Sequence, residues 1–182
     1  MIYMFIADGF EEIEALCPLD LLRRAGLSVT TVGIGGNKIT GSHGITVMTD
    51  ISDSEYGDPS PEMIILPGGM PGTKNLDASE VVDSAIRKAT ELDSYIAAIC
   101  AAPMILGKRG LLYGKQAVCY PGFEEYLSGA TVLADKGVAR DGKIVTAAGM
   151  GVALEFGLLL VSLFKGDEYA KELRSQVIAD RA

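Results

Sequence analysis

The chain has 182 residues, of which 48% are hydrophobic and 22% are charged, proportions typical of one globular domain with a substantial core over residues 1–182. Its net charge of −8 argues against a nucleic-acid backbone or an anionic membrane as the main partner, because both attract clustered Lys and Arg. Small molecules or other proteins are the expected partners.

Strand-like and helical segments alternate along the chain. In chain order the sequence predicts strand 2–7, helix 11–24, strand 28–32, strand 63–66, helix 79–92, strand 95–99, helix 102–112, strand 117–119, strand 143–146 and helix 151–164. Several strands are continuous runs of Ile, Val and Leu, as expected where helices cover both faces of a sheet. The alternation therefore predicts an α/β fold with a mostly parallel sheet between two helical layers.

Shorter segments interrupt this pattern. Asp141-Gly142 is a hairpin signal and predicts an antiparallel strand over residues 138–140. Gly35-Gly36-Asn37 indicates a second short excursion that carries residues 39 and 45–48. The acidic segment 50–61 contains two prolines and is predicted to be a loop, and residues 167–182 are predicted to form a surface helix.

The cysteines and the apolar runs bear on where the protein resides. Cys17, Cys100 and Cys119 show no CxxC spacing, so we expect reduced thiols in the cytoplasm. Residues 1–7 lack a basic leader and are better explained as a strand than as a targeting signal. The apolar run 150–164 contains Glu155 and is shorter than the roughly 20 residues that span a bilayer, so we expect a buried helix.

The segment Ala97-Ala98-Ile99-Cys100-Ala101-Ala102-Pro103 places a thiol between a predicted strand and a predicted helix. This is the context of a nucleophile elbow, in which small neighbours allow a tight turn. A helix beginning there would lower the pKa of the Cys100 thiol and favour the reactive thiolate. Free cysteines are also among the most buried residues, so core packing is the alternative.

Pro67-Gly68-Gly69 follows another predicted strand and gives a turn without side chains. Its amides, with that of Ala101, are candidates for an oxyanion hole beside Cys100, because ligands of open parallel sheets bind at the carboxyl ends of strands. A plain strand end is the alternative. The segment lacks the GxxxxGK[ST] pattern of a phosphate-binding P-loop.

Acidic residues follow the first predicted strand. Helical periodicity places Glu14 at the rim of the apolar face, where a carboxyl keeps its proton more readily and suits acid–base chemistry. Glu12 is predicted to point away, and with Glu11 it fits the ordinary preference for acids at a helix N-terminus. Asp20 is expected near the inward face, as a buried polar support for the elbow.

The remaining candidates carry weaker signals. His43 is the single histidine and lies in a Gly-Ser-His-Gly turn, so only it could serve a Cys-His pair, although solvated turn histidines are common. Cys119 ends a strand expected beside that of Cys100, where either a resolving role in disulfide chemistry or core packing is open. One histidine and three cysteines show no metal-ligand spacing, so no metal site is predicted.

Together these motifs resemble the ThiJ/PfpI superfamily, in particular its DJ-one-like branch. The resemblance covers essentially the whole chain, and the motifs that carry it are residues 11–14 followed by Pro18 and Arg23-Arg24-Ala25-Gly26, residues 66–69, residues 97–103, and residues 149–156. It implies a flavodoxin-like three-layer sandwich, a homodimer, and a protonated Glu14 carboxyl that hydrogen-bonds an oxidisable Cys100.

One position departs from the pattern of that branch. Many relatives have a histidine before the proline that follows the next strand, whereas this chain has Tyr120 before Pro121. A Cys-His-Glu triad is therefore not expected, and amidase or protease activity is disfavoured. His43 lies on the hairpin that approaches the partner's site in dimers of the branch, so a contribution across the interface is open.

The resemblance implies glutathione-independent glyoxalase, deglycase or redox-responsive chaperone activity. Our first hypothesis is a cofactor-independent enzyme in which Cys100 adds to a small α-oxoaldehyde such as methylglyoxal and Glu14 moves protons through an enediol to a hydroxy acid. The second hypothesis is a redox sensor or chaperone switched by oxidation of Cys100.

Overall fold

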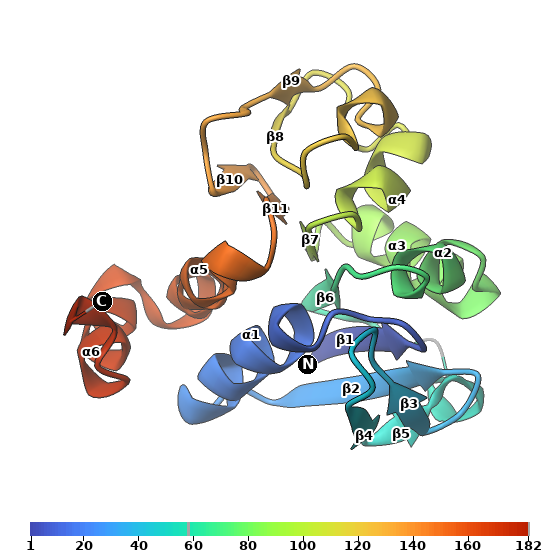
Figure 1. The fold of residues 1–182 in the computed structure, drawn as a ribbon, viewed down its shortest axis with the longest axis horizontal. Helices are drawn as coiled ribbons and strands as arrows, with labels where there is room; N and C mark the ends of the chain where they lie inside the picture. Colours follow the sequence, from blue (N-terminus) through green and yellow to red (C-terminus); the bar gives the residue numbers. More distant parts are fainter. Residues whose placement is uncertain (58, 182) are drawn as a thin grey trace.

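The computed structural model describes residues 1–57 and 59–181, and a seven-stranded sheet with strand order β10-β11-β7-β6-β1-β2-β5 forms its centre (Figure 1). The strands of this sheet are β1 Ile2–Ala7, β2 Val29–Ile34, β5 Ile51–Ser52, β6 Met63–Leu66, β7 Tyr95–Ile99, β10 Val138–Asp141 and β11 Ile144–Ala147. All neighbours pair in parallel except β10, which pairs antiparallel with β11. The predicted parallel sheet and its antiparallel edge hairpin are confirmed.

Helices cover both faces of the sheet (Figure 1). They are α1 Glu12–Arg24, α2 Gly72–Asp77, α3 Glu80–Glu91, α4 Pro103–Lys108, α5 Ala153–Lys165 and α6 Asp167–Gln176. Side chains of α1, α5 and α6 share one apolar cluster, and side chains of α2, α3 and α4 share the other. Successive residues of a strand point to opposite faces, so within β1 Met4 belongs to the first cluster and Phe5 to the second.

Close packing brings α1 against α5. A side chain on Gly157 of α5 would lie 2.6 Å from Leu21 and 2.9 Å from the backbone of Pro18, so only glycine fits this contact. Pro18 lies inside α1 rather than at its start, and the helix continues through it. The position of α1 matters for function because its first turn carries the acidic residues.

Several sequence predictions about the fold are wrong. Residues 117–119 do not form a strand of the central sheet: β8 Gln116–Ala117 pairs with β9 Thr131–Val132 in a separate two-stranded sheet. β11 pairs with β7 at the position expected for residues 117–119. The Val118 amide donates a hydrogen bond to the Thr146 side chain and not to the backbone of a neighbouring strand. The predicted helix over residues 102–112 ends at Lys108, and α2 was not predicted at all.

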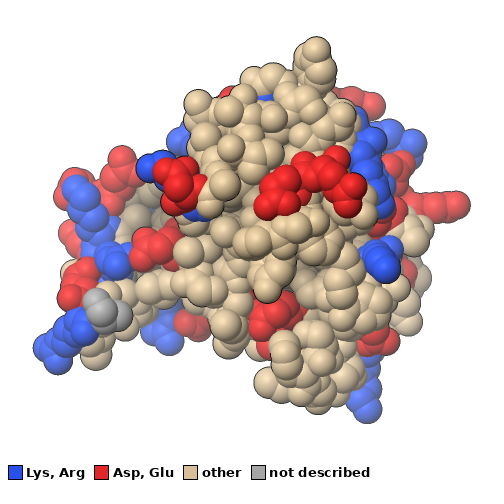
Figure 2. Space-filling view, turned by 45° about the horizontal axis from the view of Figure 1, so that its top comes forward, with Lys and Arg blue, Asp and Glu red and all other residues tan. Residues whose placement is uncertain are grey.

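Segment 50–61 is not the predicted loop throughout, because it contains β5 and a 3-10 helix over Asp53–Glu55. The other short segments follow their predictions. The excursion after β2 forms the antiparallel pair β3 Lys38–Thr40 and β4 Thr46–Met48, and residues 167–176 are helical. Within the described ranges, no helix is both long enough and apolar enough to cross a bilayer. On the face shown in Figure 2, basic side chains lie mainly toward the margins, among acidic ones, and do not gather over one element.

Candidate active site

Cys100 lies in a strained turn directly after β7. Its φ angle is +65°, a left-handed conformation that costs a non-glycine residue on the order of 1 kcal/mol. Two backbone hydrogen bonds hold the turn: the Cys100 amide donates to the Ala147 carbonyl at 2.8 Å, and the Tyr120 amide donates to the Cys100 carbonyl at 2.8 Å. Cys100 as a residue is half-buried, whereas Cys119 is buried.

Glu14 reaches this thiol from the first turn of α1. Its residue is only 1% exposed, and its carboxyl forms hydrogen bonds with the Cys100 thiol and with the Gly68 amide, the latter at 3.1 Å. The Glu11 side chain accepts a hydrogen bond from the Glu14 amide at 2.8 Å and so fixes the start of the helix. Burial raises the pKa of Glu14 to about 7.

The predicted low pKa of the thiol is wrong for this arrangement. Burial, followed by the negative charge of Glu14, raises the pKa of Cys100 to about 12. The amides of Gly69 and Ala101 donate to the sulfur and oppose that shift. Between these two pKa values the pair holds a single proton, and the thiolate forms when that proton passes from Cys100 to Glu14.

Gly68 lies where the carboxyl and the thiol meet. A Cβ atom at this position would lie 2.4 Å from Glu14 Oε2 and 2.5 Å from Cys100 Cβ, so any side chain would separate the pair. The Gly68 amide already donates to Glu14. It therefore cannot serve as the predicted oxyanion donor, whereas the amides of Gly69 and Ala101 do face the reacting sulfur.

The carboxyl end of β11 adds two residues that the sequence analysis did not single out as site residues. The Met150 amide donates to the Glu14 carboxyl, and a Cβ on Gly149 would lie 3.7 Å from Glu14 Oε1. The same Cβ would lie 3.3 Å from the Tyr120 ring, which is 50% exposed as a residue. Tyr120 and the exposed Met150 side chain thus border the mouth of the site. Gly149 and Met150 follow the predicted strand 143–146, and this position near the carboxyl end of a strand could have identified them as site residues.

Asp20 does not support the elbow, so its prediction is wrong. Its side chain is 60% exposed and pairs with Arg24, one turn further along α1. Six residues separate Asp20 from Glu14, which at 100° per residue turns the two side chains to different sides of the helix.

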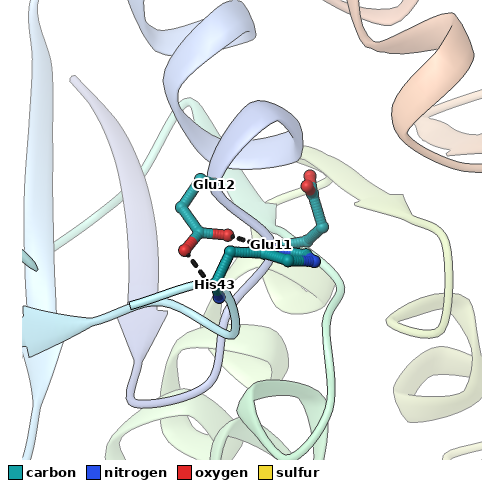
Figure 3. Close-up of side chains that lie close together, drawn as sticks. All are labelled: Glu11, Glu12 and His43. Carbon is teal, nitrogen blue, oxygen red and sulfur yellow. Dashed lines mark hydrogen bonds and ion pairs between the residues drawn. The ribbon is translucent and has the colours of Figure 1, made fainter. Parts of the chain in front are cut away.

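His43 and Glu12 fasten the β3–β4 hairpin to the start of α1 (Figure 3). The buried Glu12 carboxylate accepts hydrogen bonds from the His43 amide at 2.8 Å and from His43 Nδ1 at 2.9 Å, so Glu12 does not point away as predicted. The hydrogen bond with Glu12 raises the pKa of His43. The contacts of His43 within this chain are with Ser42 and Glu12 rather than with Cys100.

Glu11, Glu12 and His43 also bring potential metal-ligand atoms within 4.8 Å of one another (Figure 3). The Glu12 oxygens already accept hydrogen bonds from the hairpin, including the Ile45 amide at 3.4 Å. These hydrogen bonds hold the β3–β4 hairpin against the start of α1, and this structural role explains why the side chains lie close together.

Cys17 packs against the same apolar cluster as Cys100, and Cys119 belongs to the cluster on the other face of the sheet. Cys119 is 8% exposed and packs into the apolar cluster under α3 and α4, whereas Cys100 packs against the cluster on the opposite face. Burial raises the pKa of Cys119 to about 11. All three cysteines are free, and the packing of Cys119 accounts for its presence without a resolving role.

The chain is similar to known proteins over most of its length. A family model described as DJ-1/PfpI matches residues 1–163. The chain is 34% identical to Protein dj-1beta of Drosophila melanogaster over 172 residues, which cover 93% of this chain and 92% of that protein. It is 28% identical over 163 residues to the glutathione-independent glyoxalase DJR-1.2 of Caenorhabditis elegans, covering 90% and 87% of the two chains.

Solved structures share the architecture. Oxidised DJ-1 of Toxoplasma gondii superposes with a TM-score of 0.92 at 32% identity, covering 97% of each chain. This likeness extends over the central sheet and both helical layers, and it confirms the flavodoxin-like α/β sandwich implied by the sequence motifs.

Proposed function

Because the chain belongs to the DJ-1/PfpI family, we propose that it is a cofactor-independent glyoxalase that converts small α-oxoaldehydes such as methylglyoxal to hydroxy acids without glutathione. The observation that carries this proposal is the buried Glu14 carboxyl hydrogen-bonded to the half-buried Cys100 thiol. A relative that aligns with 90% of the chain is named a glutathione-independent glyoxalase, which supports the same reaction class.

The reaction begins with addition of the sulfur to the aldehyde carbon. The thiol proton passes to Glu14 as the carbon–sulfur bond forms, and the carboxylic acid then returns it to the new alkoxide. The product is a hemithioacetal on Cys100. The amides of Gly69 and Ala101, which donate to the sulfur, lie beside the developing oxyanion and stabilise it.

Proton transfer then rearranges the hemithioacetal. The Glu14 carboxylate removes the proton from the carbon bonded to sulfur, and the resulting carboxylic acid protonates the neighbouring carbonyl oxygen to give an enediol. The Glu14 carboxylate then takes the proton of the hydroxyl on the carbon bonded to sulfur and delivers it to the second carbon, which gives a thioester of the hydroxy acid. A pKa of about 7 suits a group that must both accept and donate a proton near neutral pH.

Hydrolysis completes the cycle. Water attacks the thioester carbonyl, the carbon–sulfur bond breaks, and the departing sulfur and Glu14 again share one proton. The sum is one aldehyde and one water converted to one hydroxy acid, with no external oxidant or reductant. This balance is why the proposed reaction requires no cofactor.

The direct test is an assay of the purified protein with methylglyoxal in buffer free of glutathione and other thiols. We expect loss of the aldehyde and formation of an equal amount of lactate, followed by enzymatic lactate determination and by NMR. Glyoxal should give glycolate by the same route. Absence of lactate at high protein concentration would contradict the proposal.

A redox role is the second candidate, and the same half-buried thiol favours it. Two amides that donate to the sulfur would also stabilise an oxidised sulfur acid, and a structural relative is described as an oxidised form. We expect mild peroxide to add two oxygens to Cys100 and to leave Cys119 unmodified because it is buried. Intact-mass and peptide-mass measurements check this, and equal oxidation of both thiols would remove the support for a specific sensor.

A further inference from the structure

Two exposed apolar side chains, Tyr120 and Met150, lie at the mouth of the candidate active site. A Cβ on Gly149 would lie 3.3 Å from the Tyr120 ring and 3.7 Å from Glu14 Oε1, so the ring and the carboxyl are both neighbours of the same residue. The Met150 amide donates to that carboxyl. A molecule that reacts with the pair of Cys100 and Glu14 therefore comes within reach of both apolar side chains.

Backbone and ring contacts hold Tyr120 in this position. Its amide donates to the Cys100 carbonyl at 2.8 Å, and its carbonyl accepts a hydrogen bond from the Phe123 amide at 3.1 Å. The Tyr120 ring also packs edge to face against the Phe123 ring, with 6.5 Å between the ring centroids. An aromatic ring restrained in this way offers apolar surface to a ligand and loses little conformational freedom on binding.

The inner side of the site has no room for more than the reacting atoms. A Cβ on Gly68 would lie 2.4 Å from Glu14 Oε2 and 2.5 Å from Cys100 Cβ, so a methyl group does not fit at that point. In the proposed reaction the Glu14 carboxyl serves both carbons of the α-oxoaldehyde while the sulfur is bonded to the first. The substituent on the second carbon therefore points outward, toward Tyr120 and Met150.

The charges around the pair favour an uncharged substituent. The negative charge of Glu11 is close enough to raise the pKa of Glu14, and it would repel an anionic group on the substrate. Neither Tyr120 nor Met150 carries a charge at neutral pH that would hold a charged substituent. An apolar substituent loses contact with water against these two side chains, and an aromatic one gains ring contacts as well.

We infer that Tyr120 is a specificity-determining residue, and that the site prefers α-oxoaldehydes with a large apolar substituent, such as phenylglyoxal, to those with a small or polar one. The inference rests on the proposed glyoxalase function and names the substrate class of that same site. The phenyl ring packs against Tyr120, and the flexible Met150 side chain adapts to its outline. One phenylglyoxal and one water give one mandelate, by the steps described for methylglyoxal.

The experiment compares kcat/KM for phenylglyoxal with kcat/KM for methylglyoxal, measured as mandelate and lactate formed in buffer free of thiols. Tyr120→Ala should lower the ratio of these two constants at least ~5-fold relative to the parent chain, because the ring contact and the apolar area that it buries are lost. Division by the parent ratio removes the difference in chemical reactivity between the two aldehydes.

Two further variants serve as controls for the ring. Tyr120→Phe keeps the ring without its hydroxyl and should hold the ratio within ~2-fold of the parent value. Tyr113→Ala removes a more exposed tyrosine elsewhere and should also hold it within ~2-fold. A fall of less than ~5-fold in Tyr120→Ala, or a comparable fall in either control, would overturn the inference.

A second measurement does not depend on turnover. Phenacyl bromide and bromoacetone present the same phenyl and methyl substituents to Cys100, whose sulfur displaces bromide to form a thioether with either reagent. Peptide mass spectrometry gives the rate at this residue alone, and Tyr120→Ala should lower the rate with phenacyl bromide relative to bromoacetone at least ~5-fold. If the parent chain makes neither hydroxy acid, the glyoxalase proposal fails while the alkylation rates still test the contact with Tyr120. Unchanged relative rates in Tyr120→Ala would overturn the inference even where both aldehydes are converted.

Discussion

Replacement of Cys100 by serine is expected to lower kcat/KM for methylglyoxal by at least ~10³-fold, because a hydroxyl is a far weaker nucleophile at its ordinary pKa. Glu14 has a pKa of about 7 and is too weak a base to ionise an alcohol. Serine is close in size to cysteine, so the turn and the neighbouring amides should stay in place. Lactate formation under single-turnover and steady-state conditions measures the loss.

Cys119→Ser is the matched control for this variant. It changes the same functional group in a buried position on the opposite face of the sheet, and its thiol has a pKa of about 11. Activity should stay within ~2-fold of the parent chain, with a modest loss of stability from placing a hydroxyl in an apolar cluster. Comparable activity losses in the two variants would mean that Cys100 acts through folding rather than through chemistry.

The pairing of Cys100 with Glu14 was largely accessible from the sequence. A cysteine at the end of a predicted strand and an acid on the first helical turn after another strand are both directed to one edge of a parallel sheet, and the order of the strands then brings them together. The pattern could not predict which of the two groups holds a proton at a given pH. The pKa of each group depends on its burial and on the charge of the other, and both are properties of the assembled site.

The predictions that failed share a related cause. Asp20 was placed by helical periodicity alone, and Arg24 one turn away offers it a partner at the surface. Gly68 was assigned to the oxyanion hole because it is a glycine after a strand, yet its lack of a side chain serves to let Glu14 and Cys100 meet. In both cases the residue type was informative, whereas its partner was decided by tertiary contacts.

The fold was predicted best where periodicity is strong. The pattern of apolar residues predicts the long strands and α3 directly. β8, β9 and α2 are too short for a strand or helix periodicity to be recognised in the sequence. The segment around residue 118 has the composition of a strand, but β11 takes the place beside β7. Strand order depends on long-range pairing, and composition does not encode it.

Replacement of Glu14 by glutamine is expected to lower kcat/KM by about 10²–10⁴-fold, since the amide can neither take the thiol proton nor return it to the substrate. In the parent chain kcat/KM should rise as pH increases through about 7, where the pair passes from two protons to one, and the glutamine variant should lack this rise. Glu11→Gln is the control: the charge of Glu11 raises the pKa of Glu14, so this variant should keep its activity and move the midpoint to lower pH. A parent profile that is flat from pH 6 to 8 would contradict the one-proton pair.

The same Glu14→Gln substitution should stabilise the fold above neutral pH. A pKa raised from 4.5 to about 7 means that burial stabilises the protonated carboxyl, and this contribution is lost as pH rises toward the folded-state value. From pH 5.5 to 8 the parent should therefore lose about 2 kcal/mol of unfolding free energy that glutamine, which has no proton to release, does not lose. Urea denaturation of both proteins at several pH values measures the difference. Since the carboxyl that destabilises the fold is the group that moves the protons, a gain in stability with a loss of turnover would place Glu14 in the site for its chemistry rather than for packing.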